Sequence, residues 1–279
     1  MGIRRLMALV AHPDDESMVF GGTLAKYAAA GVETAVVSAT RGDAGRHQGR
    51  RPGAPAHPGA AALAALRAQE FAAAATVLGV RDAVLLDYKD KYLDQADVGG
   101  IVEDLARHIR RFRPAVVLTF GPDGAYGHPD HIAISQYATA AVVAAGASGD
   151  RGLAHGAASP PAGPHVVSKL YFAAWPAAAW SAFDRAFPRL ASTVDGTERR
   201  AAPWPDWAVT TCIDARAHWE TAWRAVACHE SQVTAYGRLT ELSPAEHEQL
   251  WGRQWYYRVF STVNRGRTQE TDLFDGVAP

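Results

Sequence analysis

The chain has 279 residues, of which 48% are hydrophobic, and this apolar content is enough to bury a full core within one large α/β domain. Its 28 basic and 29 acidic residues leave a formal net charge of -1, so no strong electrostatic field attracts it to nucleic acid or to an anionic membrane surface. These properties argue against both of those partners and favour a small molecule.

The cysteines and the N-terminus bear on where the protein works. Cys212 and Cys228 have no CxxC spacing, which argues against a disulfide framework and against a thiolate zinc site. We expect both to be buried thiols. The apolar stretch near the N-terminus is too short for a signal peptide or a membrane span. The sequence therefore predicts a cytoplasmic protein, which could form a homo-oligomer.

Short apolar runs alternate with helical patterns along the first half of the chain. Buried strands are expected at 5–11, 32–40, 83–88 and 115–120. Helices are expected from a cap at Thr23 to a stop at Gly31, and over 63–78, 97–112 and 132–145. This alternation implies right-handed crossovers and a Rossmann-like, mostly parallel sheet flanked by helices.

The rest of the chain has longer irregular segments. From residue 41 to about 60 it is rich in Gly, Pro, Arg and His, which predicts a long surface loop that could act as a lid. Residues 146–164 predict a flexible connection. Strands at 166–175 and 207–214 and a helix at 215–230 then predict a C-terminal α/β extension. We interpret 1–279 as one domain, with a core at 1–145 and its C-terminal part at 165–279.

Polar motifs follow two of the predicted strands. AHPDDE occupies 11–16, directly after the first strand, and HPDH occupies 128–131, after the fourth. In a doubly wound sheet, ligands bind outside the carboxyl ends of the strands where the strand order reverses, so we expect the two motifs to meet. Neither motif contains the GxGxxG fingerprint that cradles a nucleotide phosphate.

Three carboxylates at one strand end repel one another and resist burial unless a cation offsets them. Histidine beside carboxylate suits zinc, which in catalytic sites takes three protein ligands and keeps a position for water. Pro129 suits the first position of a helix, so one of His128 and His131 could bind metal while the other reaches the substrate. The alternative is a helix cap and a turn with satisfied imidazoles, but the two motifs together favour a metal site.

With AHPDDE and HPDH, the chain resembles the PIG-L or LmbE-like family of zinc-dependent N-deacetylases, which includes deacetylases and amidases of mycothiol and bacillithiol metabolism. Weaker similarities lie at 66–71 (LRAQEF), 85–93 (LLDYKDKYL) and 228–232 (CHESQ). The resemblance implies an LmbE-like fold and a zinc cofactor, with Fe²⁺ as the other candidate metal.

The resemblance also implies roles for single residues. His12, Asp15 and His131 would bind zinc, and Asp14 would be the general base. His128 would protonate the departing amine.

Further residues lie at positions with implied or open roles. By the same resemblance, the hydroxyl of Tyr126 would help to hold the oxyanion, and Arg67 and Asp90 would contact the sugar. Arg67 also has a structural alternative, because it could pair with Glu70 one helix turn away. Asp130 could either orient a histidine or cap its helix.

Two more residues have a structural interpretation. Glu16 is expected to be a hydrogen-bonded structural group rather than a ligand. His229 either lies near the site, as the resemblance implies, or is a satisfied structural histidine.

The expected activity is hydrolytic. A zinc-dependent hydrolase would remove the acetyl group from an N-acetylglucosamine-type glycoside or a similar small acetamido sugar, using metal-activated water. Three residues after Glu16 the mycothiol enzymes carry Ser or Lys whereas this chain has Val19, so the mycothiol substrate is not transferred. The alternatives are an amidase that cleaves a larger amide, such as a thiol S-conjugate, and a catalytically inactive sugar-binding protein.

Overall fold

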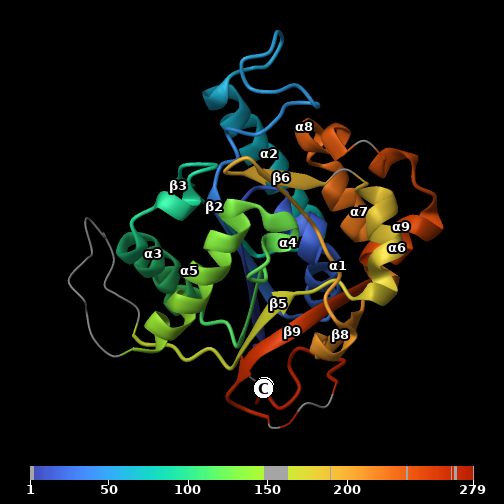
Figure 1. The fold of residues 1–279 in the computed structure, drawn as a ribbon. Helices are drawn as coiled ribbons and strands as arrows, with labels where there is room; N and C mark the ends of the chain where they lie inside the picture. Colours follow the sequence, from blue (N-terminus) through green and yellow to red (C-terminus); the bar gives the residue numbers. More distant parts are fainter. Residues whose placement is uncertain are drawn as a thin grey trace.

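The chain is organised around one seven-stranded sheet in the order β3-β2-β1-β4-β5-β9-β8 (Figure 1). The computed structural model describes residues 3–147, 163–188, 190–236, 238–264, 266 and 269–278. The parallel strands are β1 (Arg5–Val10), β2 (Glu33–Thr40), β3 (Asp82–Tyr88), β4 (Val116–Thr119) and β5 (Lys169–Ala173). β9 (Arg253–Ser261) runs antiparallel to β5 and to β8 (Thr211–Asp214). The predicted mostly parallel sheet is confirmed.

Helices cover both faces of this sheet. The long ones are α1 (Asp15–Ala29), α2 (Ala60–Leu78), α3 (Val98–Phe112) and α5 (Pro129–Gly146). The shorter ones are α4 (Gly124–Gly127), α6 (Trp180–Ala186), α7 (Trp219–Ala227), α8 (Glu230–Val233) and α9 (Pro244–Trp251). α1, α2 and α7 pack together, as do α3 and α5 (Figure 1). These two groups form the layers that a doubly wound sheet requires.

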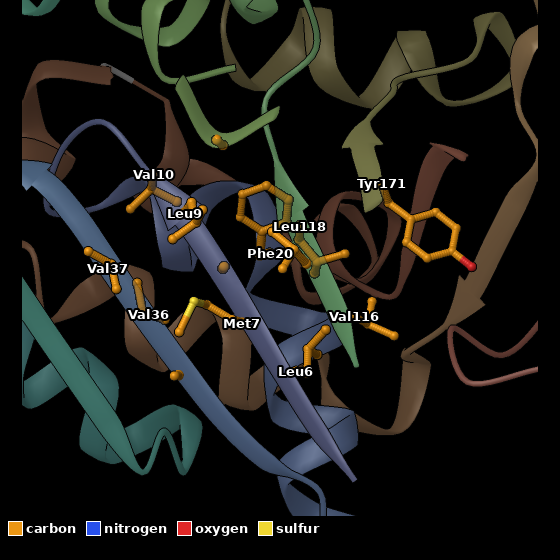
Figure 2. Packing of buried hydrophobic residues seen from close by; sticks show 14 of the residues in the cluster. Leu6, Met7, Leu9, Val10, Phe20, Val36, Val37, Val116, Leu118 and Tyr171 are labelled. Carbon is orange, nitrogen blue, oxygen red and sulfur yellow. The ribbon is translucent and has the colours of Figure 1, made fainter. Parts of the chain in front are cut away.

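The central strands are apolar along their whole length because both of their faces are covered. Leu6, Met7 and Leu9 of β1 are at most 1% exposed. Figure 2 shows apolar side chains of β1, β2 and β4 gathered with Phe20 of α1 at the centre of the sheet. This core holds the carboxyl ends of β1 and β4 in fixed positions.

The prediction that Thr23 caps the first helix is wrong. α1 begins at Asp15, and Thr23 lies inside it, where its hydroxyl bonds to that of Tyr256 at 2.6 Å. Glycines usually weaken a helix interior, but α1 continues through Gly21 and Gly22. A Cβ on Gly22 would lie 2.3 Å from the carbonyl oxygen of Trp251, so close packing, rather than a turn, requires this glycine.

Other predicted elements of the first half are confirmed with small changes of boundary. Asp97 caps α3 by accepting from the backbone N–H of Gly100 at 2.6 Å. The segment between β2 and α2 contains no helix or strand, as expected of the loop from residue 41. The predicted connection at 146–164 lies, apart from its two ends, outside the described residues.

The second half differs more from the prediction. The expected helix over 215–230 is interrupted between α7 and α8, where the buried His229 has a non-helical ψ of 56°. The sequence did not predict the hairpin of β6 (Ala191–Val194) and β7 (Thr197–Arg200), whose strands are short and mostly exposed. It also did not predict β9, which pairs only with distant segments of the described chain.

The prediction of buried thiols is also wrong, because both cysteines are partly exposed and free. Cys212 lies on β8, an edge strand of the sheet. Cys228 follows the last turn of α7, where its thiol donates to the carbonyl oxygen of Arg224 at 3.3 Å. Neither position is covered on all sides.

Among the described helices, α2 alone has the length and apolar composition of a membrane span. Its inner face, however, carries Arg67 and Glu70, both buried and both hydrogen-bonded within the protein. A charged face that is satisfied by other parts of the chain is typical of a helix packed in a protein core.

Candidate active site

The two polar motifs meet where the strand order reverses. From β1 the chain proceeds outward through β2 to β3, whereas from β4 it proceeds to β5 on the other side. The loops that leave β1 and β4 therefore separate and open a crevice at their carboxyl ends. As predicted, Pro129 takes the first position of α5, and the Nδ1 atom of the cap residue His128 accepts from the backbone N–H of Asp130 at 3.2 Å.

Three possible ligand atoms converge in this crevice. His12 Nδ1 lies 3.2 Å from His131 Nε2, and His131 Nε2 lies 3.3 Å from Asp15 Oδ1. His12 Nδ1 is 3.5 Å from Asp15 Oδ2. Tetrahedral zinc with ligands at about 2.0–2.1 Å holds its ligand atoms roughly 3.3 Å apart. The structure thus brings together the three predicted ligands, with one possible ligand atom of each residue within 4.8 Å of the others. The two imidazole nitrogens already have the spacing of such a site.

A second ring of carboxylates orients His12. Its Nε2 atom lies 3.1 Å from Asp130 Oδ2 and 3.3 Å from Asp90 Oδ1. Burial disfavours a charge on His12, but hydrogen bonds to Asp130, Asp15 and Asp90 outweigh this and raise its pKa well above the ordinary value. An imidazole that donates from one nitrogen to a carboxylate presents the lone pair of the other nitrogen to a metal.

Asp130 also fixes the loop after β3, because it accepts from the backbone N–H groups of Lys91 and Leu93 at 2.7 and 3.1 Å. Asp130 was predicted either to orient a histidine or to cap its helix, and these contacts favour the first role. The ring of His131 is itself held by stacking on Phe120, with ring centroids 4.0 Å apart.

Asp14 lies beside the converging ligands in a strained backbone conformation, with φ at 121°. Its Oδ2 atom is 3.1 Å from Arg67 Nη2 and 3.4 Å from the hydroxyl of Tyr236. Burial raises the pKa of Asp14 to about 6. The positive charge of Arg67 lowers this pKa, and the negative charge of Asp15 raises it further. Such a carboxylate can take up a proton near neutral pH.

Glu16 holds the backbone of Asp14 from behind. It is fully buried and accepts from the Asp14 N–H at 2.9 Å and from the Ser17 hydroxyl at 2.6 Å. Its other partner is His229, whose Nε2 atom is 2.7 Å from Glu16 Oε1. Glu16 is thus hydrogen-bonded as predicted. The contacts of His229 favour the alternative that places it near the site, because it holds Glu16 behind Asp14, while its Nδ1 atom has no hydrogen-bond partner in the described part of the chain.

Arg67 and Asp90 are both buried, at 3% and 4% exposure. Arg67 binds the carbonyl oxygens of Gly42 and Pro13 as well as Asp14. A Cβ on Gly42 would lie 2.1 Å from the guanidinium, so this glycine is required by the close approach of Arg67. The alternative of an Arg67–Glu70 pair is wrong, because Glu70 accepts instead from the backbone N–H and hydroxyl of Ser231.

Tyr126 and His128 complete the rim of the crevice. The ring of Tyr126 is 5.4 Å from that of His131, and the ring of His128 is 4.7 Å from it. Burial and the charges of Asp15 and Asp14 raise the pKa of Tyr126, so its hydroxyl remains a donor. Burial and the imidazoles of His131 and His12 lower the pKa of His128 to about 3, so it is neutral before it exchanges a proton.

An apolar cavity of about 580 Å³, counted with its opening to solvent, adjoins these groups. Asp14, Asp15, Tyr126 and His131 form its polar end. Its other walls include Val19, Phe120, Trp175, Phe187, Leu250 and Trp251. Tyr236 also lines it. No sequence motif marks this residue, because its contact with Asp14 joins segments that are far apart along the chain.

The fold and the site together define a doubly wound α/β protein with a group of His and Asp side chains at its switch point that could hold a metal ion. The family model described as GlcNAc-PI de-N-acetylase matches residues 7–142. A 1D-myo-inositol 2-acetamido-2-deoxy-α-D-glucopyranoside deacetylase of Rhodococcus jostii is 35% identical over 99% of both chains, and a similarly named protein of Catenulispora acidiphila is 34% identical over 98% of this chain and 97% of its own. The chain belongs to the PIG-L family of N-deacetylases.

Solved structures agree on the fold. The N,N'-diacetylchitobiose deacetylase from Pyrococcus horikoshii has a TM-score of 0.60 at 22% identity, covering 82% of this chain and 70% of its own. GalB, a 4-carboxy-2-hydroxymuconate hydratase from Pseudomonas putida, has a TM-score of 0.67 at 22% identity, covering 95% and 99%. Because one fold supports both reactions, the activity of this chain must be argued from its site.

Proposed function

We propose that the protein is a zinc-dependent N-deacetylase that hydrolyses the amide of an acetamido sugar to the free amine and acetate. The observation that carries the proposal is the convergence of His12, Asp15 and His131 beside a strained, buried Asp14. The names of the relatives support the acetamido-sugar class.

The donor set fits zinc. Two imidazole nitrogens and one carboxylate oxygen are a common catalytic set for this ion, and the carboxylates of Asp130 and Asp90 on His12 supply the outer contacts that such ligands need. When bound, zinc would polarise the amide carbonyl and lower the pKa of a water molecule to about 7.

The protein's own residues then divide the proton transfers. Asp14 takes the proton from the attacking water, and its raised pKa matches that task. The hydroxyl of Tyr126 donates to the carbonyl oxygen as negative charge develops there. His128 delivers a proton to the amine nitrogen; because it is neutral at rest, it must first take one up. Arg67 holds Asp14 in place by its ion pair.

Paired substitutions test this division of roles. Asp14→Asn should keep the bound metal while kcat falls by orders of magnitude, whereas His12→Ala should lose the metal itself. Asparagine suits the positive φ of this position better than alanine does. The measurements are zinc content by elemental analysis and amine release from N-acetylglucosamine glycosides. Equal loss of metal in both variants would contradict the proposed roles.

Amine release by the zinc-loaded wild-type chain also separates the enzyme from an inactive sugar-binding protein. Binding of zinc and of an acetamido sugar with no turnover of any substrate tested would favour the binding protein over the deacetylase.

A further inference from the structure

We infer that the substrate carries an apolar group, either an acyl chain longer than acetyl or an apolar aglycon, that occupies the cavity next to the proposed metal ligands. This inference rests on the proposed function and narrows its substrate class. The cavity is continuous with the site, since Asp14, Asp15 and His131 are part of its lining.

The walls of the cavity favour an apolar occupant. Phe120, Trp175, Phe187 and Leu250 contribute aromatic and aliphatic surface. Two polar atoms of the lining are already used: the indole N–H of Trp251 donates to the carbonyl oxygen of Met18 at 3.3 Å, and the Tyr236 hydroxyl contacts Asp14. A polyol in this space would lose hydrogen bonds to water and find few replacements.

The extent of the apolar walls points the same way. The space between these walls is about 580 Å³ when its opening to solvent is included. An acetyl group alone would leave most of these walls facing water, and water in an apolar cavity lacks the polar partners that it needs. A longer apolar group would displace that water.

The buried polar side chains that could bind hydroxyls face elsewhere. Arg67 and Asp90 are not part of the cavity lining, and their contacts are with Gly42, Ala44 and the site residues Asp14 and His12. Beyond its polar end, the cavity therefore offers few partners for sugar hydroxyls, which suits the apolar part of a substrate.

Two substrate series test the inference and separate the two sources of the apolar group. The first series keeps glucosamine and lengthens the acyl group from acetyl through butanoyl to hexanoyl. The second keeps N-acetylglucosamine and lengthens the β-glycoside from methyl to hexyl. Each methylene group buried in the cavity should raise kcat/KM by about fourfold, so one series should rise at least tenfold. Flat or falling values in both series would overturn the inference.

Binding of a molecule that cannot be hydrolysed distinguishes this inference from the proposed function. Hexyl β-D-glucopyranoside should bind at least tenfold more tightly than the methyl glycoside, as measured by the fluorescence of the lining residues Trp175 and Trp251. Chain-length-dependent binding without any amide hydrolysis would overturn the deacetylase but support the cavity. Hydrolysis of acetamido sugars without chain-length dependence would support the deacetylase and overturn the inference about the cavity.

Variants that fill the cavity test whether the dependence of kcat/KM on chain length arises there. Leu250→Trp fills its space and should reduce the ratio of kcat/KM between hexyl and methyl substrates at least fivefold. Trp207→Ala is the matched control, since Trp207 is 81% exposed and lies outside the lining, and it should leave this ratio unchanged. Should Leu250→Trp fail to fold, Val19→Phe fills the cavity from α1. An unchanged ratio in a folded filling variant would overturn the inference.

Discussion

Removal of the Glu16 carboxylate should affect both stability and activity. Glu16 and His229 are 0% and 1% exposed and lie 2.7 Å apart. Burial acts against both charges, but mutual attraction and the hydrogen bond lower the pKa of Glu16 and raise that of His229. Glu16→Ala leaves the imidazole without its partner and also leaves the Asp14 N–H and the Ser17 hydroxyl without their acceptor.

The magnitude follows from that count of lost contacts. Breaking a buried ion pair by removing one partner costs about 3–5 kcal/mol, and domains are stable by only about 5–15 kcal/mol. Glu16→Ala should therefore fold with a much reduced free energy of unfolding. Glu16→Gln keeps the size and an acceptor oxygen, so it should lose only about 1–3 kcal/mol.

The functional effect acts through Asp14. A non-glycine residue at φ 121° keeps that conformation only where its surroundings enforce it, at about 1–3 kcal/mol of strain. The hydrogen bond from its N–H to Glu16 is part of that enforcement. Glu16→Ala should therefore lower kcat more than it changes KM, with Glu16→Gln in between.

The assay is a double-mutant cycle in urea, with chelator present so that metal binding does not contribute. Glu16→Ala and His229→Ala should each be strongly destabilising, and the double variant should cost clearly less than the sum of both, by at least about 1 kcal/mol. Additive losses, or a loss below about 1 kcal/mol in Glu16→Ala, would refute the reasoning that this pair is a buried, coupled ion pair.

Three further predictions concern stability. Burial raises the pKa of the Glu270 carboxyl, but hydrogen bonds, led by the one from Lys169, outweigh it and lower this pKa from 4.5 to about 2. The ionised Glu270 therefore stabilises the fold by about 3 kcal/mol above pH 4.5, and this contribution is lost as pH falls towards 2. Acid unfolding of Glu270→Gln should accordingly show a weaker pH dependence than that of the wild type. Chelation should lower the thermal midpoint of the wild type and of Asp14→Asn but not of His12→Ala, because zinc at a hundred times Kd stabilises by about 2.7 kcal/mol. Asp97→Ala should lose about 1 kcal/mol in urea unfolding, since the cap of α3 is removed.

The sequence by itself determined the parallel core and the meeting of the two motifs. Each depends on local order along the chain: an apolar run predicts a covered strand, and the polar residues that follow it lie at its carboxyl end. The convergence of His12, Asp15 and His131, which the family resemblance named as metal ligands, could therefore be expected without coordinates, as could the start of α5 at Pro129.

Only the tertiary structure decided the features made by segments that are distant along the chain. α1 runs through its glycine pair because Trp251 packs against Gly22, and Arg67 faces Asp14 rather than Glu70 because the loop after β2 closes over it. The cavity walls come from α1, α9 and the segments after β4 and β5. Periodicity reports only which face of an element is apolar, whereas a cavity depends on which faces meet and how closely they pack.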